Sequence, residues 1–181
     1  MDLSSNIAMV KFINNLKKSS PNFTTDDFKN IIAKKEDSVY YLNFKEDDNL
    51  IMVYYDNLPK GIEAVMSYAL ENNTRSCILE KDTLKLLTTQ FNKIIYNAEA
   101  IKFLEKYDWK KVVVEKCYEG TTILVYHHND KWYVSTRRCL DARESTWVKY
   151  KSYREMFDEA ITNKFSYDDL NKDYCYYFIL L

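Results

Sequence analysis

The chain has 181 residues, of which 46% are hydrophobic and 15% aromatic, enough for one domain with a substantial core and too few for two of ordinary size. Its 26 Lys and Arg stand against 27 Asp and Glu, and this balance excludes a general attraction to nucleic acid, so any phosphate binding must come from local clusters. Only 2 glycines occur, which excludes the glycine-rich phosphate loops of P-loop and dinucleotide-binding proteins.

Cysteine spacing and hydropathy predict an intracellular, cytoplasmic protein. The four cysteines are widely spaced without a C-x-x-C pair, and no charged-then-apolar signal segment opens the chain. The longest apolar run, YCYYFILL at residues 174–181, has the length of a strand and is too short to span a bilayer. We therefore expect no membrane partner.

Residues 1–38 are predicted to form a helical lead-in. Apolar residues recur at helical spacing through residues 5–18, and Thr24 or Thr25 can cap a second helix that runs through Phe28 and Ile32. From residue 39 the pattern changes, because two β-rich runs flank KEDDN between residues 39 and 55 and predict a hairpin.

Helical and strand patterns then alternate. Residues 61–73 have helical spacing, residues 76–87 resemble two short strands, and residues 97–107 again predict a helix. The run VVVEKC at residues 112–117 is rich in β-branched residues and predicts a further strand.

Residues 121–138 predict a β-hairpin closed by a two-residue turn at Asn129-Asp130. That turn sets three cross-strand pairs: Tyr126 with Tyr133, Leu124 with Ser135, and Thr122 with Arg137. The hairpin is therefore expected to return Arg137 and Arg138 close to Glu119 and Gly120.

The last third of the chain predicts a helix over residues 152–165, a short turn capped by Ser166, and a terminal strand. Taken together, the elements indicate an α+β fold with an antiparallel sheet core.

Residues 115–139, EKCYEGTTILVYHHNDKWYVSTRRC, resemble motif I and the following hairpin of the covalent nucleotidyltransferases. This superfamily comprises ATP-dependent DNA ligases, RNA ligases and mRNA capping enzymes, and the likeness is greatest to RNA ligases of the phage T4 RNA ligase 1 type, which implies a viral setting. Upstream, TRSCILE resembles the family's R-G-I-x-F/D strand, and TTQFNKIIYN its K-F-F-N segment. The resemblance implies an antiparallel-sheet nucleotidyltransferase (ATP-grasp-like ligase) domain over residues 39–181 that is partial, because the family's later motifs have no counterpart.

In that family a lysine attacks the α-phosphate of ATP to give lysyl-AMP, and a metal ion helps to neutralise the departing pyrophosphate. The AMP later passes to an RNA 5′-phosphate. When Glu119-Gly120 is aligned with the family's Asp-Gly, Cys117 takes the nucleophile position and Lys116 falls one residue early. Neighbouring side chains of a strand face opposite ways, so Lys116 points away from a ligand that Cys117 meets, unless a bulge changes the register. A displaced Lys116 nucleophile, a replacement Cys117 nucleophile and a site without chemistry remain open, and the last is favoured.

Several other residues carry the ligand binding that the resemblance implies. Arg75 matches the arginine of the R-G motif, and Phe91 keeps one aromatic ring that can pack on adenine. Arg137 and Arg138 stand where the family has a lysine-rich K-S-K-G, and arginine can also clamp phosphate by paired hydrogen bonds.

Residues 135–154 interleave basic residues with three aromatic ones, Trp147, Tyr150 and Tyr153. Such a pattern suits an RNA backbone with base stacking, and it suits a solvated surface equally well.

The sequence therefore predicts an RNA-ligase-like domain, degenerate or truncated, that binds nucleotide or RNA without full ligation and is inactive on its own. The alternative is an active ATP-dependent RNA ligase that forms lysyl-AMP on Lys116, with a complementing partner chain for the missing C-terminal motifs. ATP and Mg²⁺ are cofactors only in that alternative, and no residue is assigned to a protein-bound metal. A third alternative is a reading-frame fragment without an independent role.

Overall fold

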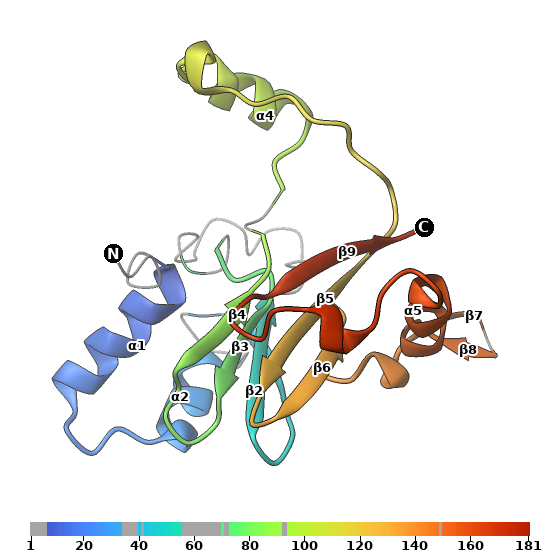
Figure 1. Cartoon of the computed structure of the whole chain (residues 1–181). Helices are drawn as coiled ribbons and strands as arrows, with labels where there is room; N and C mark the ends of the chain where they lie inside the picture. Colours follow the sequence, from blue (N-terminus) through green and yellow to red (C-terminus); the bar gives the residue numbers. More distant parts are fainter. Residues whose placement is uncertain are drawn as a thin grey trace.

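Two amphipathic helices form the first layer of the fold (Figure 1). The structure, a computed structural model, describes residues 7–33, 40, 42–55, 70, 73–91, 94–148 and 150–181. Helix α1 (Ala8–Ser19) buries Met9 and Ile13, and helix α2 (Thr25–Ile32) buries Phe28 and Ile32. Thr24 caps α2, since its hydroxyl oxygen accepts from the Asp27 N–H at 3.1 Å and its own N–H donates to the Asp27 carboxylate at 2.9 Å. Both predicted helices are confirmed.

The second layer is an antiparallel sheet in the order β1-β2-β3-β4. Its strands are β1 (Leu42–Glu46), β2 (Leu50–Tyr55), β3 (Cys77–Glu80) and β4 (Leu86–Thr89). The hairpin predicted around KEDDN and the two short strands predicted at residues 76–87 are confirmed. Strand β2 is buried on both faces, and its Ile51 and Val53 pack in one core with α1 and α2.

The third layer is an antiparallel sheet in the order β6-β5-β9, formed by β5 (Thr121–His128), β6 (Lys131–Ser135) and β9 (Tyr176–Leu180). Asn129 and Asp130 close the β5-β6 turn with φ of 48° and 56°, the positive angles that a type I′ turn requires. The predicted pairs of Tyr126 with Tyr133 and of Leu124 with Ser135 are confirmed.

The predicted pair of Thr122 with Arg137 is wrong. Strand β6 ends at Ser135, because the N–H of Thr136 donates to the carbonyl of Cys139 at 3.0 Å and turns the chain away from β5. Thr122 instead lies opposite Ile179 of β9, on the other side of β5.

The two sheets face each other, and a helix covers the outer face of the second (Figure 1). Their common core contains Leu50, Met52, Tyr54 and Ile78 from the first sheet and Leu124, Tyr126 and Tyr133 from the second. On the outer face of the second sheet, Ile123 and Val125 of β5 pack with Phe157 and Ile161 of α5 (Tyr153–Ile161). The α+β class is therefore confirmed as a helix–sheet–sheet–helix arrangement.

Short elements connect β6 to α5 and α5 to β9. The 3-10 turn η3 (Ala142–Glu144) precedes a small hairpin of β7 (Thr146–Val148) and β8 (Lys151–Ser152), and η4 (Tyr167–Asp169) follows α5. Ser152 caps α5, because its hydroxyl oxygen accepts from the Glu155 N–H at 3.2 Å. Its own N–H and hydroxyl donate to the Glu155 carboxylate at 2.7 Å each and thereby lower the pKa of Glu155. Ser166 caps η4 as predicted.

Residues 94–119 extend from the body as an arm (Figure 1). The arm contains α4 (Asn97–Leu104), which buries none of its residues, and η2 (Trp109–Lys111). The predicted strand at residues 112–117 is wrong: these residues pair with no strand in the described part of the chain, and Val113 and Val114 are 78% and 88% exposed. A β-branched run without a hydrogen-bonding neighbour does not make a strand.

The predicted helix at residues 61–73 lies outside the described residues, apart from Leu70 and Asn73. No helix among those described has the length and apolar character needed to cross a membrane.

Candidate functional site

Two concavities adjoin where the chain enters β5. The first, here called the apolar pocket, has a volume of about 530 Å³ and is lined by Glu119, Gly120, Thr121, Trp147, Tyr153, Met156, Leu180 and Leu181. The second, here called the basic hollow, has a volume of about 260 Å³ and is lined by Arg75, Gly120, Thr121, Thr122, Thr136, Arg137, Arg138, Ser145 and Tyr153. They share Gly120, Thr121 and Tyr153, so the two concavities are neighbours.

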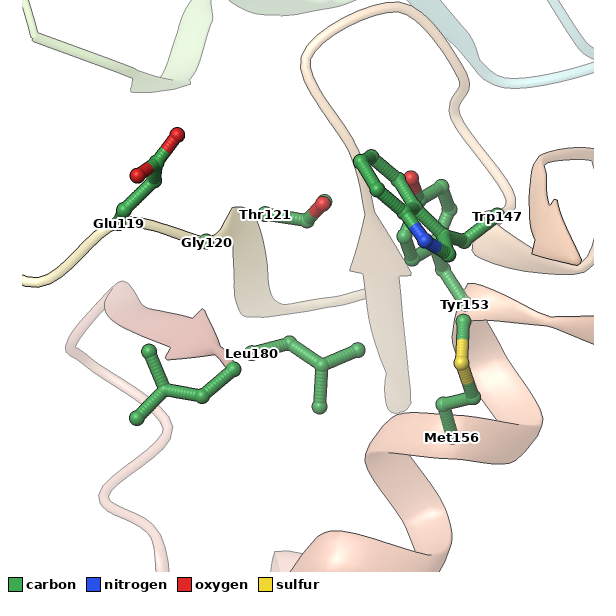
Figure 2. Close-up of a pocket in the computed structure, with 8 residues that line it drawn as sticks. Glu119, Gly120, Thr121, Trp147, Tyr153, Met156 and Leu180 are labelled. Atoms are coloured by element: carbon green, nitrogen blue, oxygen red, sulfur yellow. The ribbon is translucent and has the colours of Figure 1, made fainter.

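The apolar pocket is built where β9, β7 and α5 come together. Figure 2 shows Leu180 of β9 on one side and Trp147 with Tyr153 on the other, and Met156 extends from α5 beside Tyr153. The Ser152–Glu155 cap fixes the first turn of α5 and thus the position of Tyr153. Trp147 is 76% exposed, so this wall of the pocket is open to solvent.

The basic hollow gathers three arginines from two distant parts of the sequence. Arg75 precedes β3, whereas Arg137 and Arg138 follow β6. The Arg137 guanidinium lies 4.6 Å from the centroid of the Tyr55 ring and donates to the Tyr55 carbonyl at 3.1 Å, which ties it to the first sheet. The described lining residues contribute four hydroxyl groups besides that of Tyr153, and no Asp or Glu is among these residues. Guanidinium and hydroxyl donors together suit a phosphate group.

Gly120 allows β9 to approach β5 closely. A Cβ atom at this position would lie 2.4 Å from the Leu180 carbonyl oxygen and 2.8 Å from a side-chain carbon of Ile179. No side chain fits in that space, so the packing of β9 requires a glycine here.

The structure brings together five of the predicted site residues. Glu119 and Gly120 line the apolar pocket, and Gly120 joins Arg75, Arg137 and Arg138 around the basic hollow. Arg137 and Arg138 line one concavity with Gly120, as expected, but Glu119 does not line it, and the Thr122–Arg137 pair on which the prediction was based does not form.

The other three predicted residues lie elsewhere. Lys116 and Cys117 are exposed on the arm, outside both concavities, and the Lys116 amine is 4.8 Å from the centroid of the Tyr118 ring. Phe91 is 55% exposed and its ring packs at 5.1 Å on Tyr177, also outside both concavities. The alternation argument about Lys116 and Cys117 also falls, because residues 112–117 are not a strand.

No three His, Cys, Asp or Glu side chains of the described residues group closely enough to hold a metal ion by themselves. Neither concavity is lined by a lysine from the described part of the chain.

The sequence did not predict the apolar pocket. The sequence places Trp147 and Tyr153 in a basic, aromatic stretch, Met156 in a helix over residues 152–165 and Leu180 in a terminal strand, and none of these patterns indicates a pocket. Their shared wall arises from the packing of α5 against the end of β9, and local sequence patterns contain no information about that packing.

The fold and these concavities define an α+β protein with a local cluster of cations beside an apolar pocket. Part of the chain is similar to the immediate-early protein ICP-46 homolog of Invertebrate iridescent virus 6, with 40% identity over 76 residues, 41% of this chain and 16% of that protein. It is also similar to the homolog of Invertebrate iridescent virus 3, with 32% identity over 69 residues, 35% of this chain and 15% of that protein.

The match spans about one sixth of the length of these curated relatives. Both relatives are viral proteins, in agreement with the predicted viral setting. No protein-family model and no solved structure matches the chain.

Proposed function

We propose that the chain binds the phosphate groups of RNA or of a nucleotide in the basic hollow, as an RNA-ligase-like domain that does not complete ligation. The observation that carries this proposal is the convergence of Arg75, Arg137 and Arg138 on one concavity. The chain as a whole has a net charge of -1, so this cluster is a local feature and does not follow from a basic composition.

The position of Lys116 supports binding without adenylation. A lysine nucleophile must be held at the α-phosphate by its surroundings, and metal-assisted neutralisation must assist the departure of pyrophosphate. Lys116 is exposed on an arm, outside the concavity where the arginines gather. The described residues of the basic hollow therefore supply hydrogen-bond donors for a phosphate group, and Lys116 is not placed there as a nucleophile.

Binding of a 5′-phosphorylated single-stranded RNA, followed by fluorescence anisotropy at several salt concentrations, tests the proposal. The double variant Arg75→Ala plus Arg138→Ala is expected to raise the dissociation constant about tenfold or more, because two charge-assisted contacts are lost. The slope of log affinity against log salt should fall by about 0.7 for each lost phosphate contact. Arg137 is left in place because it also holds the Tyr55 carbonyl.

A matched control is Lys18→Ala plus Lys164→Ala, which removes two exposed cations that lie outside both concavities. Equal losses in the two double variants would mean that only overall charge matters, and the hollow would then not be the binding site.

Covalent chemistry is tested with ATP labelled on the α-phosphate in the presence of Mg²⁺. We expect no covalent label on the wild-type protein and none on Lys116→Ala, with an active nucleotidyltransferase as the positive control. A wild-type label that Lys116→Ala abolishes would refute this part of the proposal and establish the active-ligase alternative.

A further inference from the structure

We propose that the apolar pocket receives an unpaired base of the same ligand whose phosphate enters the basic hollow. The ligand class is then single-stranded nucleic acid, read with little sequence preference. This inference rests on the proposed function, because it places the base beside a phosphate that the arginines hold.

The chemistry of the pocket walls fits a base. The pocket volume of about 530 Å³ falls within the ordinary range of small-molecule sites. Its walls are formed mainly by two aromatic side chains, Trp147 and Tyr153, and by three apolar ones, Met156, Leu180 and Leu181. Aromatic side chains on an open wall are the usual stacking platform for bases in single strands.

The exposure of Trp147 is the second reason. Trp147 is 76% exposed. It belongs to the small β7-β8 hairpin and lies beside Tyr153 (Figure 2). A large aromatic ring that lines a concavity and stays exposed is available to a ligand. Tyr150, in the same hairpin, is 91% exposed but does not line this pocket.

The residues that line both concavities indicate which ligand would fit the apolar pocket. Gly120, Thr121 and Tyr153 line both concavities, so a group in the pocket lies next to a group in the hollow. A nucleotide has this arrangement of an apolar flat ring beside an anion. An apolar peptide would fill the pocket without using the arginines.

The same walls disfavour a duplex and strong base selection. In a duplex the bases are stacked and paired, whereas an unpaired base can turn out onto an aromatic surface. The polar groups of the described side chains that line the pocket are the Glu119 carboxylate, the Thr121 and Tyr153 hydroxyls and the Trp147 indole N–H, spread over three separate segments of the chain. Because base discrimination requires several directed hydrogen bonds, stacking should dominate.

The decisive experiment compares three probes of equal length and 5′-phosphorylation: a single-stranded RNA, a duplex RNA, and an oligonucleotide whose sugars carry no bases. Trp147→Ala should weaken single-stranded RNA binding about tenfold and leave abasic binding unchanged, whereas Trp147→Phe should restore most of the loss. Trp109→Ala is the matched control, since Trp109 is 64% exposed on the arm and lines neither concavity. The single strand should bind more tightly than either other probe.

The outcomes separate this inference from the proposed function. If Arg75→Ala plus Arg138→Ala weakens all probes while Trp147→Ala changes none, the phosphate site stands and the base pocket is refuted. Equal loss of abasic and RNA binding in Trp147→Ala, or a duplex that binds as tightly as the single strand, would also overturn the base pocket. Absence of binding to every probe would refute both. Thermal unfolding of each variant confirms that the fold is intact.

Discussion

Phe157→Ala is expected to lower the free energy of unfolding by about 3–5 kcal/mol, the range for removing a buried aromatic side chain. Phe157 is 2% exposed, and its ring centroid lies 5.1 Å from that of Phe178. It packs in the core between α5 and the second sheet, with Ile123 and Val125 of β5. Because the same helix carries Tyr153 and Met156, the variant should also loosen the apolar pocket. Chemical denaturation followed by circular dichroism measures the loss.

The control for this variant is Tyr150→Ala, which also removes an aromatic ring but from a position that is 91% exposed. Surface changes of this kind usually alter stability by less than about 0.5 kcal/mol. Similar losses in Phe157→Ala and Tyr150→Ala would mean that α5 does not pack on the outer face of the second sheet.

Local sequence patterns were enough to predict the hairpins. Asn129 and Asp130 tolerate the positive φ that a two-residue turn needs, and β5 and β6 contain the residues that a strand favours. Turn chemistry and register come from neighbouring residues, so Tyr126 and Tyr133 could be paired without knowledge of the rest of the fold.

The same reasoning failed at residues 112–117. Val113 and Val114 favour a strand only when another strand supplies hydrogen bonds and side chains against which to pack. In the structure the arm supplies neither, and both side chains remain exposed. Strand formation depends on distant parts of the chain, and a single sequence does not state which parts meet.

Prediction of the site shows the same division. Arg137 and Arg138 lie beside Gly120 as predicted, but not through the hairpin register that led to the prediction, because β6 ends at Ser135 and the chain then turns. The basic hollow adjoins the apolar pocket because of the way α5 and β9 pack on β5. No local sequence pattern predicts that tertiary packing. The motif resemblance points to Lys116, which lies away from both concavities.

Gly120→Ala is expected to destabilise the protein and to displace the end of β9. The added Cβ would meet the Leu180 carbonyl oxygen at 2.4 Å, and backbone atoms cannot rotate aside as a flexible side chain can. Overpacking of this kind costs about 1–3 kcal/mol. Alanine also reduces the entropy of the unfolded chain, but that gain is only about 0.4–1 kcal/mol and requires a site without strain. The steric cost therefore dominates, and the unfolding midpoint should fall.

The neighbouring variant Glu119→Ala serves as the control, because Glu119 is exposed and its replacement adds no atom near β9. Hydrogen exchange of the backbone amides of Ile179 and Leu180 should increase in Gly120→Ala and stay unchanged in Glu119→Ala. Leu180 and Leu181 form a wall of the apolar pocket, so Gly120→Ala should weaken binding of the single-stranded RNA more than binding of the abasic oligonucleotide. Unchanged stability and exchange would show that β9 does not close on Gly120. If both change as expected, packing against β9 is sufficient to explain why residue 120 is a glycine.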